Sequence, residues 1–254
     1  MTKNCLYGLL TLLVSLLMSA CGGGRQDGVL LVGTEATYPP FEMTNEAGEI
    51  VGFDIDLIKA IAADQGLSLE FRDMDFDSLV PAVQGGNIDI AASGMSITPL
   101  RLQQVAFTDP YIEAGLVVAV GPQATKVRGV DDLKGLRIAV QQGTTGAAKA
   151  EALLAAKSVG SVKYFPNVSV AMMELLNGGV DAVINDKPVT EAFVARHPGK
   201  IKIVGDTLAS DQYGFALAKG REELLAKLNA GLAKVKADGT WDQLSAQYFG
   251  DAAE

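Results

Sequence analysis

The segment VQGGNID at residues 83–89 recurs as LLNGGVD at residues 175–181. In each copy an apolar helical pattern ends at a glycine pair, and a short run with strand character follows it. Glycines end helices because they adopt the left-handed backbone without steric cost. The recurrence indicates two α/β units of similar plan in one chain. Helix, glycine pair and strand is a common order, so chance similarity stays open as the alternative.

Outside this repeat, short β-type runs alternate with amphipathic helical patterns, which predicts mainly parallel sheets covered by helices. Asp75 or Asp77 is expected to cap one helix and Ser169 another, while Thr98 followed by proline starts the helix that carries Arg101. Two final helices, near residues 222–237 and 240–248, have no counterpart in the second unit. The C-terminus is therefore expected to return to the first unit. The predicted strands lie near residues 29–32, 67–71, 88–92, 137–140, 181–184 and 213–218.

The N-terminus has the order of a bacterial export signal. Lys3 precedes an apolar stretch over residues 6–18, which is shorter than the roughly 18 to 20 apolar residues of a membrane-spanning helix. Small residues before Cys21 and three glycines after it resemble the lipobox of bacterial lipoproteins, in which the cysteine is acylated. We therefore expect a signal peptide over residues 1–20 and a flexible tether over 21–27. An ordinary cleaved signal is the alternative.

Composition excludes several other classes of function. The net charge of −9 leaves no basic face for nucleic acid. Cys21 would be the only thiol after cleavage, which excludes disulfides and cysteine-based metal sites. His197 is the only histidine and is expected at the surface, so neither a zinc cluster nor a catalytic triad can be assembled. Neither a Walker loop nor a dinucleotide-binding turn occurs at a strand end. No cofactor and no metal are expected.

A series of motifs in a fixed order resembles the polar amino-acid-binding proteins of bacterial ABC transporters, which are periplasmic solute-binding proteins of family 3. The resemblance covers nearly the whole mature chain, and the ordered series is far more specific than any one motif. Its motifs are GTEATYPPFE at residues 33–42, VGFDID at 51–56, MDFDSLVPA at 74–82, SGMSIT at 93–98, Arg101, FTDPY at 107–111, GTT at 143–145, DAV at 181–183 and DGT at 238–240.

The resemblance implies a two-lobed periplasmic-binding-protein fold of type II. Each lobe is a mainly parallel sheet flanked by helices, and two crossing hinge strands join the lobes, which close on the ligand. We expect hinge strands at residues 111–115 and 209–213. Residues 28–110 and 214–254 would then form lobe 1, and residues 116–208 would form lobe 2.

A free amino acid carries a carboxylate and an ammonium on one carbon, and burying both requires a partner for each charge. Arg101 can bind the carboxylate with its planar fork, and free amides near Gly94, Ser96 and Thr145 can add donors. Asp186 can receive the ammonium. Both charged residues match the charge clamp of the family, from opposite lobes. The alternatives are that Arg101 is a solvated helix residue and that Asp186 caps the following helix.

Other positions are expected to select the side chain. Tyr38 and Phe76 match positions whose rings flank the ligand, with plain core packing as the alternative, and Glu35 matches a position that meets the far end of a polar side chain. Gln141 and Asn185 depart from glutamine binders, which carry lysine and histidine there. The pattern is closest to arginine and basic amino-acid binders. The predicted ligand-binding set is Glu35, Tyr38, Phe76, Gly94, Met95, Ser96, Arg101, Gln141, Thr144, Thr145, Asn185 and Asp186.

The predicted function is the substrate-binding component of an ABC-type amino-acid importer, with arginine or another basic amino acid as ligand. The expected partners are the free amino acid, the permease subunits and, through Cys21, a membrane. The protein is expected to be a monomer in the periplasm or at the cell surface, and not an enzyme. Glutamine binding is the first alternative. A prephenate or arogenate dehydratase on the same scaffold and a receptor's sensor domain are the others.

Overall fold

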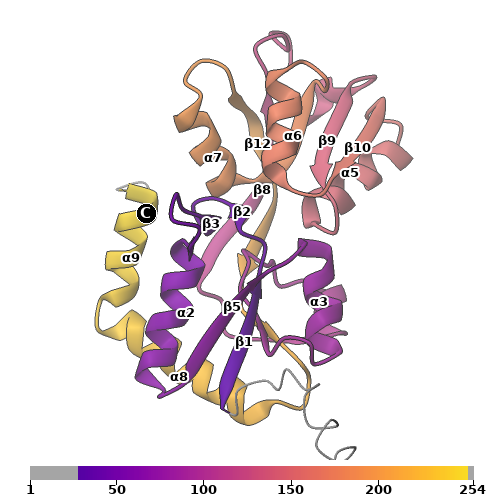
Figure 1. Cartoon of the computed structure of the whole chain (residues 1–254). Helices are drawn as coiled ribbons and strands as arrows, with labels where there is room; N and C mark the ends of the chain where they lie inside the picture. Colours follow the sequence, from indigo (N-terminus) through magenta and orange to yellow (C-terminus); the bar gives the residue numbers. More distant parts are fainter. Residues whose placement is uncertain (1–27, 251–254) are drawn as a thin grey trace, which may run out of the picture.

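The chain folds into two lobes, which lie one above the other in Figure 1. The structure, a computed structural model, describes residues 28–250. The predicted signal peptide and the whole of the predicted tether, including Cys21, lie outside the described residues. The chain builds most of the lower lobe first, crosses to the upper lobe, and returns to the lower lobe with its last two helices (Figure 1). Among residues 28–250, no helix has the length and apolar character needed to cross a bilayer.

Lobe 1 is built on a five-stranded sheet with the strand order β5-β1-β6-β13-β7. β1 runs parallel to both of its neighbours, whereas β13 is antiparallel to both of its own. A small antiparallel sheet, β2-β3-β4, lies beside it. The strands are β1 (Val29–Thr34), β2 (Thr37–Tyr38), β3 (Glu42–Thr44), β4 (Ile50–Val51), β5 (Ser68–Asp73), β6 (Ile90–Ala91), β7 (Ala106–Phe107) and β13 (Ala216–Leu217); the helices are α2 (Phe53–Asp64), α3 (Phe76–Gln84), α4 (Pro99–Leu102), α8 (Glu222–Ala237) and α9 (Thr240–Phe249).

Lobe 2 repeats this plan with the strand order β10-β9-β11-β8-β12. The first three strands are parallel, and β8 is antiparallel to both of its neighbours. The expected class, parallel-rich sheets flanked by helices, is confirmed, although each sheet is antiparallel on one side. The strands are β8 (Ile112–Val120), β9 (Arg137–Gln141), β10 (Ser161–Phe165), β11 (Ala182–Asp186) and β12 (Lys202–Tyr213); the helices are η1 (Val130–Leu133), α5 (Thr145–Ala155), α6 (Val168–Leu176) and α7 (Lys187–Arg196).

The repeated segment has the same structural role in both lobes. In lobe 1, the Asp89 N–H donates to the Leu31 carbonyl, and the Asp89 carboxylate accepts the Leu31 N–H, each at 2.8 Å. In lobe 2, Asp181 makes both bonds with Arg137 at the same distances. The aspartate therefore ties the chain that follows the glycine pair to a neighbouring parallel strand, β1 in lobe 1 and β9 in lobe 2, which explains why the two segments are alike.

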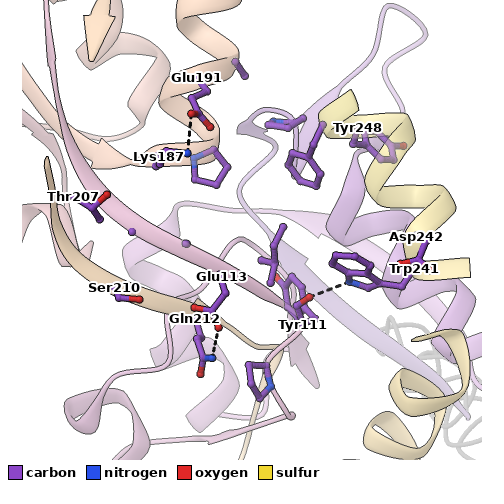
Figure 2. A pocket seen from close by; sticks show the side chains of 18 of the residues that line it. Tyr111, Glu113, Lys187, Glu191, Thr207, Ser210, Gln212, Trp241, Asp242 and Tyr248 are labelled. Atoms are coloured by element: carbon purple, nitrogen blue, oxygen red, sulfur yellow. Dashed lines mark hydrogen bonds and ion pairs between the residues drawn. The ribbon is translucent and has the colours of Figure 1, made fainter. Parts of the chain in front are cut away.

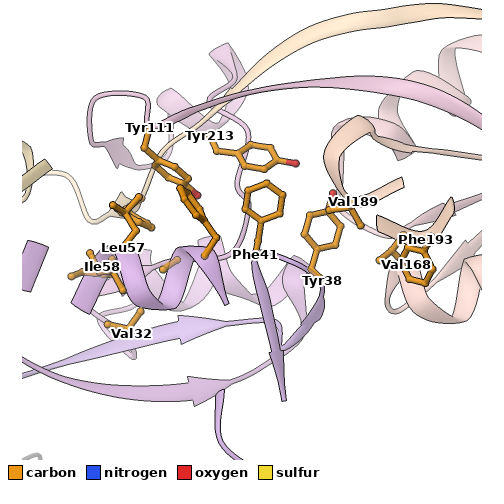
Figure 3. Packing of buried hydrophobic residues seen from close by; sticks show 14 of the residues in the cluster. Val32, Tyr38, Phe41, Leu57, Ile58, Tyr111, Val168, Val189, Phe193 and Tyr213 are labelled. Atoms are coloured by element: carbon orange, nitrogen blue, oxygen red, sulfur yellow. The ribbon is translucent and has the colours of Figure 1, made fainter. Parts of the chain in front are cut away.

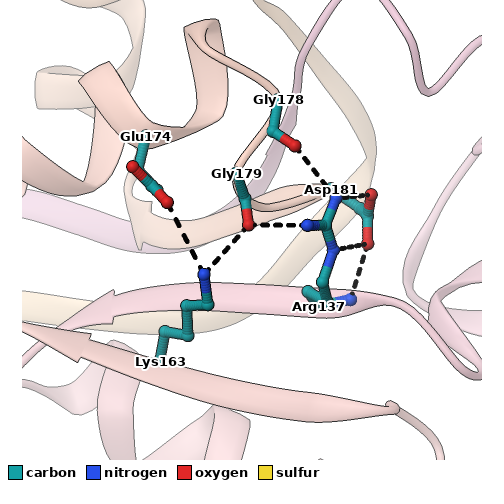
Figure 4. A network of polar contacts seen from close by, with 6 residues as sticks. All are labelled: Arg137, Lys163, Glu174, Gly178, Gly179 and Asp181. Atoms are coloured by element: carbon teal, nitrogen blue, oxygen red, sulfur yellow. Dashed lines mark hydrogen bonds and ion pairs between the residues drawn. The ribbon is translucent and has the colours of Figure 1, made fainter.

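In lobe 2 the Arg137 side chain extends this network (Figure 4). Its guanidinium binds both oxygens of Asp181 and donates to the carbonyls of Gly178, at 3.0 Å, and Gly179, at 2.8 Å. Lys163 donates to the same Gly179 carbonyl and pairs with Glu174. These carbonyls directly follow α6, so the two cations lie near the negative end of the helix dipole, where positive charge is stabilising.

The two long strands β8 and β12 connect the lobes. They pair antiparallel from Ile112 with Tyr213 to Leu116 with Ala209, and a bulge interrupts β12 before Ala209. Tyr213 also bridges to Ser96 of lobe 1. The strands thus belong to the sheet of lobe 2 and end at lobe 1, in the region where the sequence predicts the crossings. The lobe boundaries themselves stay predictions.

Helix caps agree with the sequence in part. Thr98 and Thr144 accept backbone N–H groups at the starts of α4 and α5, as their side-chain chemistry predicts. The prediction that Ser169 caps α6 is wrong: Asn167 accepts the Val170 N–H at 2.9 Å, while the Ser169 hydroxyl donates across the cleft to Thr37. Asp75 occupies the cap position of α3, but its side chain makes no cap hydrogen bond.

Candidate functional site

A small cavity lies between the lobes, and every residue that lines it belongs to the predicted ligand-binding set. Its free volume is about 10 Å³, close to the space that one water molecule requires. A larger ligand therefore enters only if the lobes or the lining rings move. The lining residues are Tyr38, Phe76, Gly94, Ser96 and Arg101 from lobe 1 and Gln141, Thr144, Thr145 and Asp186 from lobe 2.

Arg101 supplies the positive charge of the cavity. Its backbone N–H is held by the Thr98 cap, which fixes the first turn of α4. One guanidinium nitrogen donates to the Ser96 carbonyl at 2.7 Å and another to the Gly143 carbonyl of lobe 2 at 3.1 Å. The guanidinium carbon lies 5.3 Å from the centre of the Phe76 ring. Burial lowers the pKa of Arg101 from its usual value, but a guanidinium stays protonated in proteins.

Asp186 supplies the negative charge from lobe 2. It ends β11, is buried, and makes no side-chain cap for α7, so the alternative role as a helix cap is wrong. One of its carboxylate oxygens accepts the Tyr38 hydroxyl at 2.7 Å and also the Tyr213 hydroxyl. Burial raises the pKa of Asp186, and the two hydroxyls oppose that rise because they donate to the carboxylate.

Backbone donors at the cavity are fewer than the sequence suggests. The Gly94 N–H is already used, because it donates to the buried Asp54 carboxylate at 2.7 Å. Thr145 is the first residue of α5, where backbone N–H groups have no intrahelical partner. The helix start can therefore add a donor for a carboxylate from lobe 2.

Glu35 lies beside the cavity and is 5% exposed. Its carboxylate accepts the Thr37 hydroxyl and, at 3.2 Å, the side-chain amide of Gln141. Burial raises the pKa of Glu35 to about 7; the Thr37 and Gln141 bonds oppose this, while the charges of Asp73 and Asp75 add to it. This end of the site therefore favours a positive charge.

The comparisons with known proteins agree with this geometry. The family model described as bacterial extracellular solute-binding proteins, family 3, matches residues 30–251. The chain belongs to this family.

Its relatives include a probable histidine-binding protein of Neisseria gonorrhoeae, which is 36% identical over 92% of this chain and 91% of the relative. The ABC transporter arginine-binding protein 1 of Escherichia coli (strain K12) is 36% identical over 93% of this chain and 97% of its own. An ancestral arginine-binding protein, solved with arginine and with glutamine, is 45% identical, with TM-scores of 0.84 and 0.83. Both structures cover 89% of this chain and 100% of their own.

Three of the predicted residues do not line the cavity of this solute-binding protein. Met95 is fully buried in the core of lobe 1, so its side chain is not available to a ligand. Asn185 lies behind Asp186, where its amide donates to the Asp186 carbonyl at 3.3 Å and to Thr190 at 3.4 Å. Glu35, the third, reaches the lining through Gln141.

Tyr213 contacts the cavity residue Asp186, a role that the sequence did not indicate. Its ring lies in a row of aromatic side chains that leads from the core of lobe 1 to Tyr38 (Figure 3). The centre of the Phe41 ring is 5.1 Å from that of Tyr213 and 6.2 Å from that of Tyr38. Phe41 thus holds the two tyrosines whose hydroxyls meet at Asp186. A tyrosine at the end of a hinge strand is the signal that could have identified this role.

A second, much wider hollow of about 1570 Å³ lies on the hinge side of the solute-binding protein (Figure 2). Its walls include Tyr111, whose carbonyl accepts the Trp241 indole N–H at 3.0 Å, and Lys187, which pairs with Glu191. Neither Arg101 nor Asp186 lines it. The smaller cavity differs from this hollow because Arg101 of lobe 1 and Asp186 of lobe 2 both line it.

Proposed function

We propose that this protein is the amino-acid-binding component of an ABC importer and that its ligand is arginine. The observation that carries the proposal is the single cavity bounded by Arg101 from lobe 1 and Asp186 from lobe 2. Arg101 would bind the ligand carboxylate with help from the start of α5, and Asp186 would bind the ammonium.

Burial of both ligand charges is costly unless each has a partner. Arg101 forms charge-assisted bonds in a fork that matches a carboxylate. In the structure its guanidinium donates to the carbonyls of Ser96 and Gly143, and Asp186 accepts two tyrosine hydroxyls. These neutral partners are weaker than the opposite charges of a zwitterion, so an amino acid gains free energy when it replaces part of them.

Glu35 is the reason for preferring arginine. A guanidinium keeps its charge and supplies several donors, and Tyr38 and Phe76 offer rings against which it can stack. The names of the relatives, which refer to arginine and histidine, support a basic ligand. Glutamine is the second candidate, because a protonated Glu35 could donate to a carboxamide, and the ancestral relative was also solved with glutamine.

Ligand that contacts both lobes stabilises the form in which they meet, and this shift in population is the proposed mechanism. The permease would then recognise surfaces that closure brings together. We infer no catalytic role, and the protein is expected to act as a monomer. Prephenate and arogenate should remain unchanged in its presence; their turnover would contradict this inference.

A thermal-shift panel on protein that has been unfolded and refolded tests the ligand assignment. Arginine at 1000 times its dissociation constant should stabilise the protein by about 4 kcal/mol, with lysine and histidine weaker. The variant Glu35→Gln should lose far more affinity for arginine than for glutamine, and the exposed Glu46→Gln serves as the matched control. Equal losses for both ligands would remove the preference for a cation.

The lipid anchor belongs to the same proposal. Acylation of Cys21 would place the protein at a membrane surface in the periplasm or at the cell exterior. The variant Cys21→Ser should move the protein from the membrane fraction to the aqueous fraction without changing arginine affinity. If the wild type and the variant are both in the aqueous fraction, an ordinary cleaved signal is used instead.

A further inference from the structure

A further contact between the lobes lies outside the cavity. The Gln142 side-chain amide of lobe 2 donates to the Asp77 carboxylate of lobe 1 at 2.7 Å. Both side chains are exposed, and neither residue lines the cavity. Asp77 lies in the first turn of α3, and Gln142 follows β9 directly. The bond therefore joins the two lobes at the solvent-facing mouth of the cleft.

The backbone beside this bond approaches lobe 1 very closely. A Cβ atom placed on Gly143 would lie 2.8 Å from the Asp77 Cβ and 3.2 Å from the Asp77 Cα. Gly143 also has a φ of +76°, a left-handed conformation that side chains other than glycine rarely adopt. Its carbonyl accepts the Arg101 guanidinium of lobe 1. Gly143 thus contacts two residues of the opposite lobe, and a side chain at this position would collide with Asp77.

We propose that Asp77, Gln142 and Gly143 form an interlobe latch, which sets how long the lobes stay together and does not select the ligand. Asp77 and the other two residues are joined only through the hinge strands, so their contacts break whenever the lobes separate. The latch would favour the closed form by the same amount whichever amino acid lies in the cavity. This proposal rests on the proposed solute-binding function.

The test compares dissociation rates for two ligands. In Gln142→Ala, the dissociation rates of arginine and of glutamine should rise by the same factor, about 2- to 10-fold for one lost hydrogen bond. Gln142→Glu, which places a second carboxylate against Asp77, should raise both rates further. Gly143→Ala should weaken both ligands more than tenfold. The matched controls Gln104→Ala and Gln104→Glu, at an exposed glutamine of lobe 1, should change neither rate.

Two outcomes would contradict the proposed latch. Unchanged dissociation rates in Gln142→Glu would show that the contact does not hold the lobes. A change confined to one ligand would make Gln142 a specificity residue instead. Unfolding of the two Gln142 variants without amino acid should match the wild type, which separates a latch from a role in folding.

A second readout does not depend on ligand identity. Spin labels on Ser68→Cys and Ser161→Cys, at the exposed edge strands β5 and β10, report the distance between the lobes. Gln142→Glu should populate the longer distance more than the wild type, and an identical distribution would overturn the latch. If the wild type binds no amino acid at all, the proposed function fails, and the latch is judged by this distance alone.

Discussion

Arginine binding should become tighter as the pH rises from 6 to 8, and Glu35 is the reason. Burial holds the pKa of this carboxyl at about 7 in the absence of a nearby cation, so much of it is protonated at pH 6. A guanidinium beside it favours the ionised form and lowers the pKa. Binding therefore releases a proton, which weakens affinity below pH 7 and leaves it nearly constant above pH 8.

The size of the effect follows from the pKa. With a pKa of about 7 in the free protein and the carboxyl fully ionised in the complex, the affinity at pH 8 exceeds that at pH 6 by about tenfold. By the same arithmetic, the number of protons released per arginine bound is about 0.9 at pH 6 and about 0.5 at pH 7. Glutamine brings no charge, so its affinity should not rise over this range.

Calorimetric titration in two buffers of different ionisation enthalpy measures both the affinity and the number of protons released. Glu35→Gln should abolish the pH dependence of arginine binding, whereas Glu46→Gln should retain it. A flat arginine affinity between pH 6 and 8, or an unchanged slope in Glu35→Gln, would refute the assignment of Glu35 to the ligand side chain.

Three further predictions concern buried groups. Burial and the neighbouring Asp54 raise the pKa of Glu42 above its ordinary 4.5, so its contribution to stability is present below about pH 4.5 and is lost as the pH rises. Glu42→Gln should therefore gain at least about 1 kcal/mol over the wild type in urea unfolding at pH 9 but not at pH 4, and the reverse order would contradict the burial of this carboxyl. Phe53→Ala should cost about 3–5 kcal/mol in unfolding free energy, because its ring packs against Trp241 and Phe249 of α9; a loss below 1 kcal/mol would deny that α9 completes lobe 1. Tyr213→Phe should change arginine affinity by about 3- to 10-fold through Asp186 without a change in fold, and wild-type affinity would remove Tyr213 from the site.

Local chemistry explains why most of the fold could be predicted. Glycine pairs, threonine caps and apolar periodicity act over a few residues, so the Thr98 cap and the two repeated segments were predicted correctly. The nine cavity residues followed from motifs whose order along the chain is preserved. The antiparallel strands at one side of each sheet were not predicted, because they pair with strands that are distant in sequence.

The wrong predictions have a common physical cause. In each case a contact with a residue distant in sequence replaces the contact that the local sequence suggests. Gly94 offers a backbone donor in sequence, but the buried Asp54 takes it. Ser169 has the chemistry of a cap, yet it bonds to the other lobe. Met95 sits among site residues in sequence but points into the core. Tyr213 contacts Asp186 only because the hinge brings them together, and no short-range pattern reports such a contact.

The central claim is that one charge from each lobe holds a single amino acid. The most direct test is calorimetric titration of refolded Arg101→Ala with L-arginine, beside the wild type and the exposed control Arg72→Ala. Loss of a buried, charge-paired partner costs about 2–5 kcal/mol or more, so binding to Arg101→Ala should weaken by at least about 30-fold while its unfolding stays unchanged. Near-native affinity in Arg101→Ala would contradict the claim.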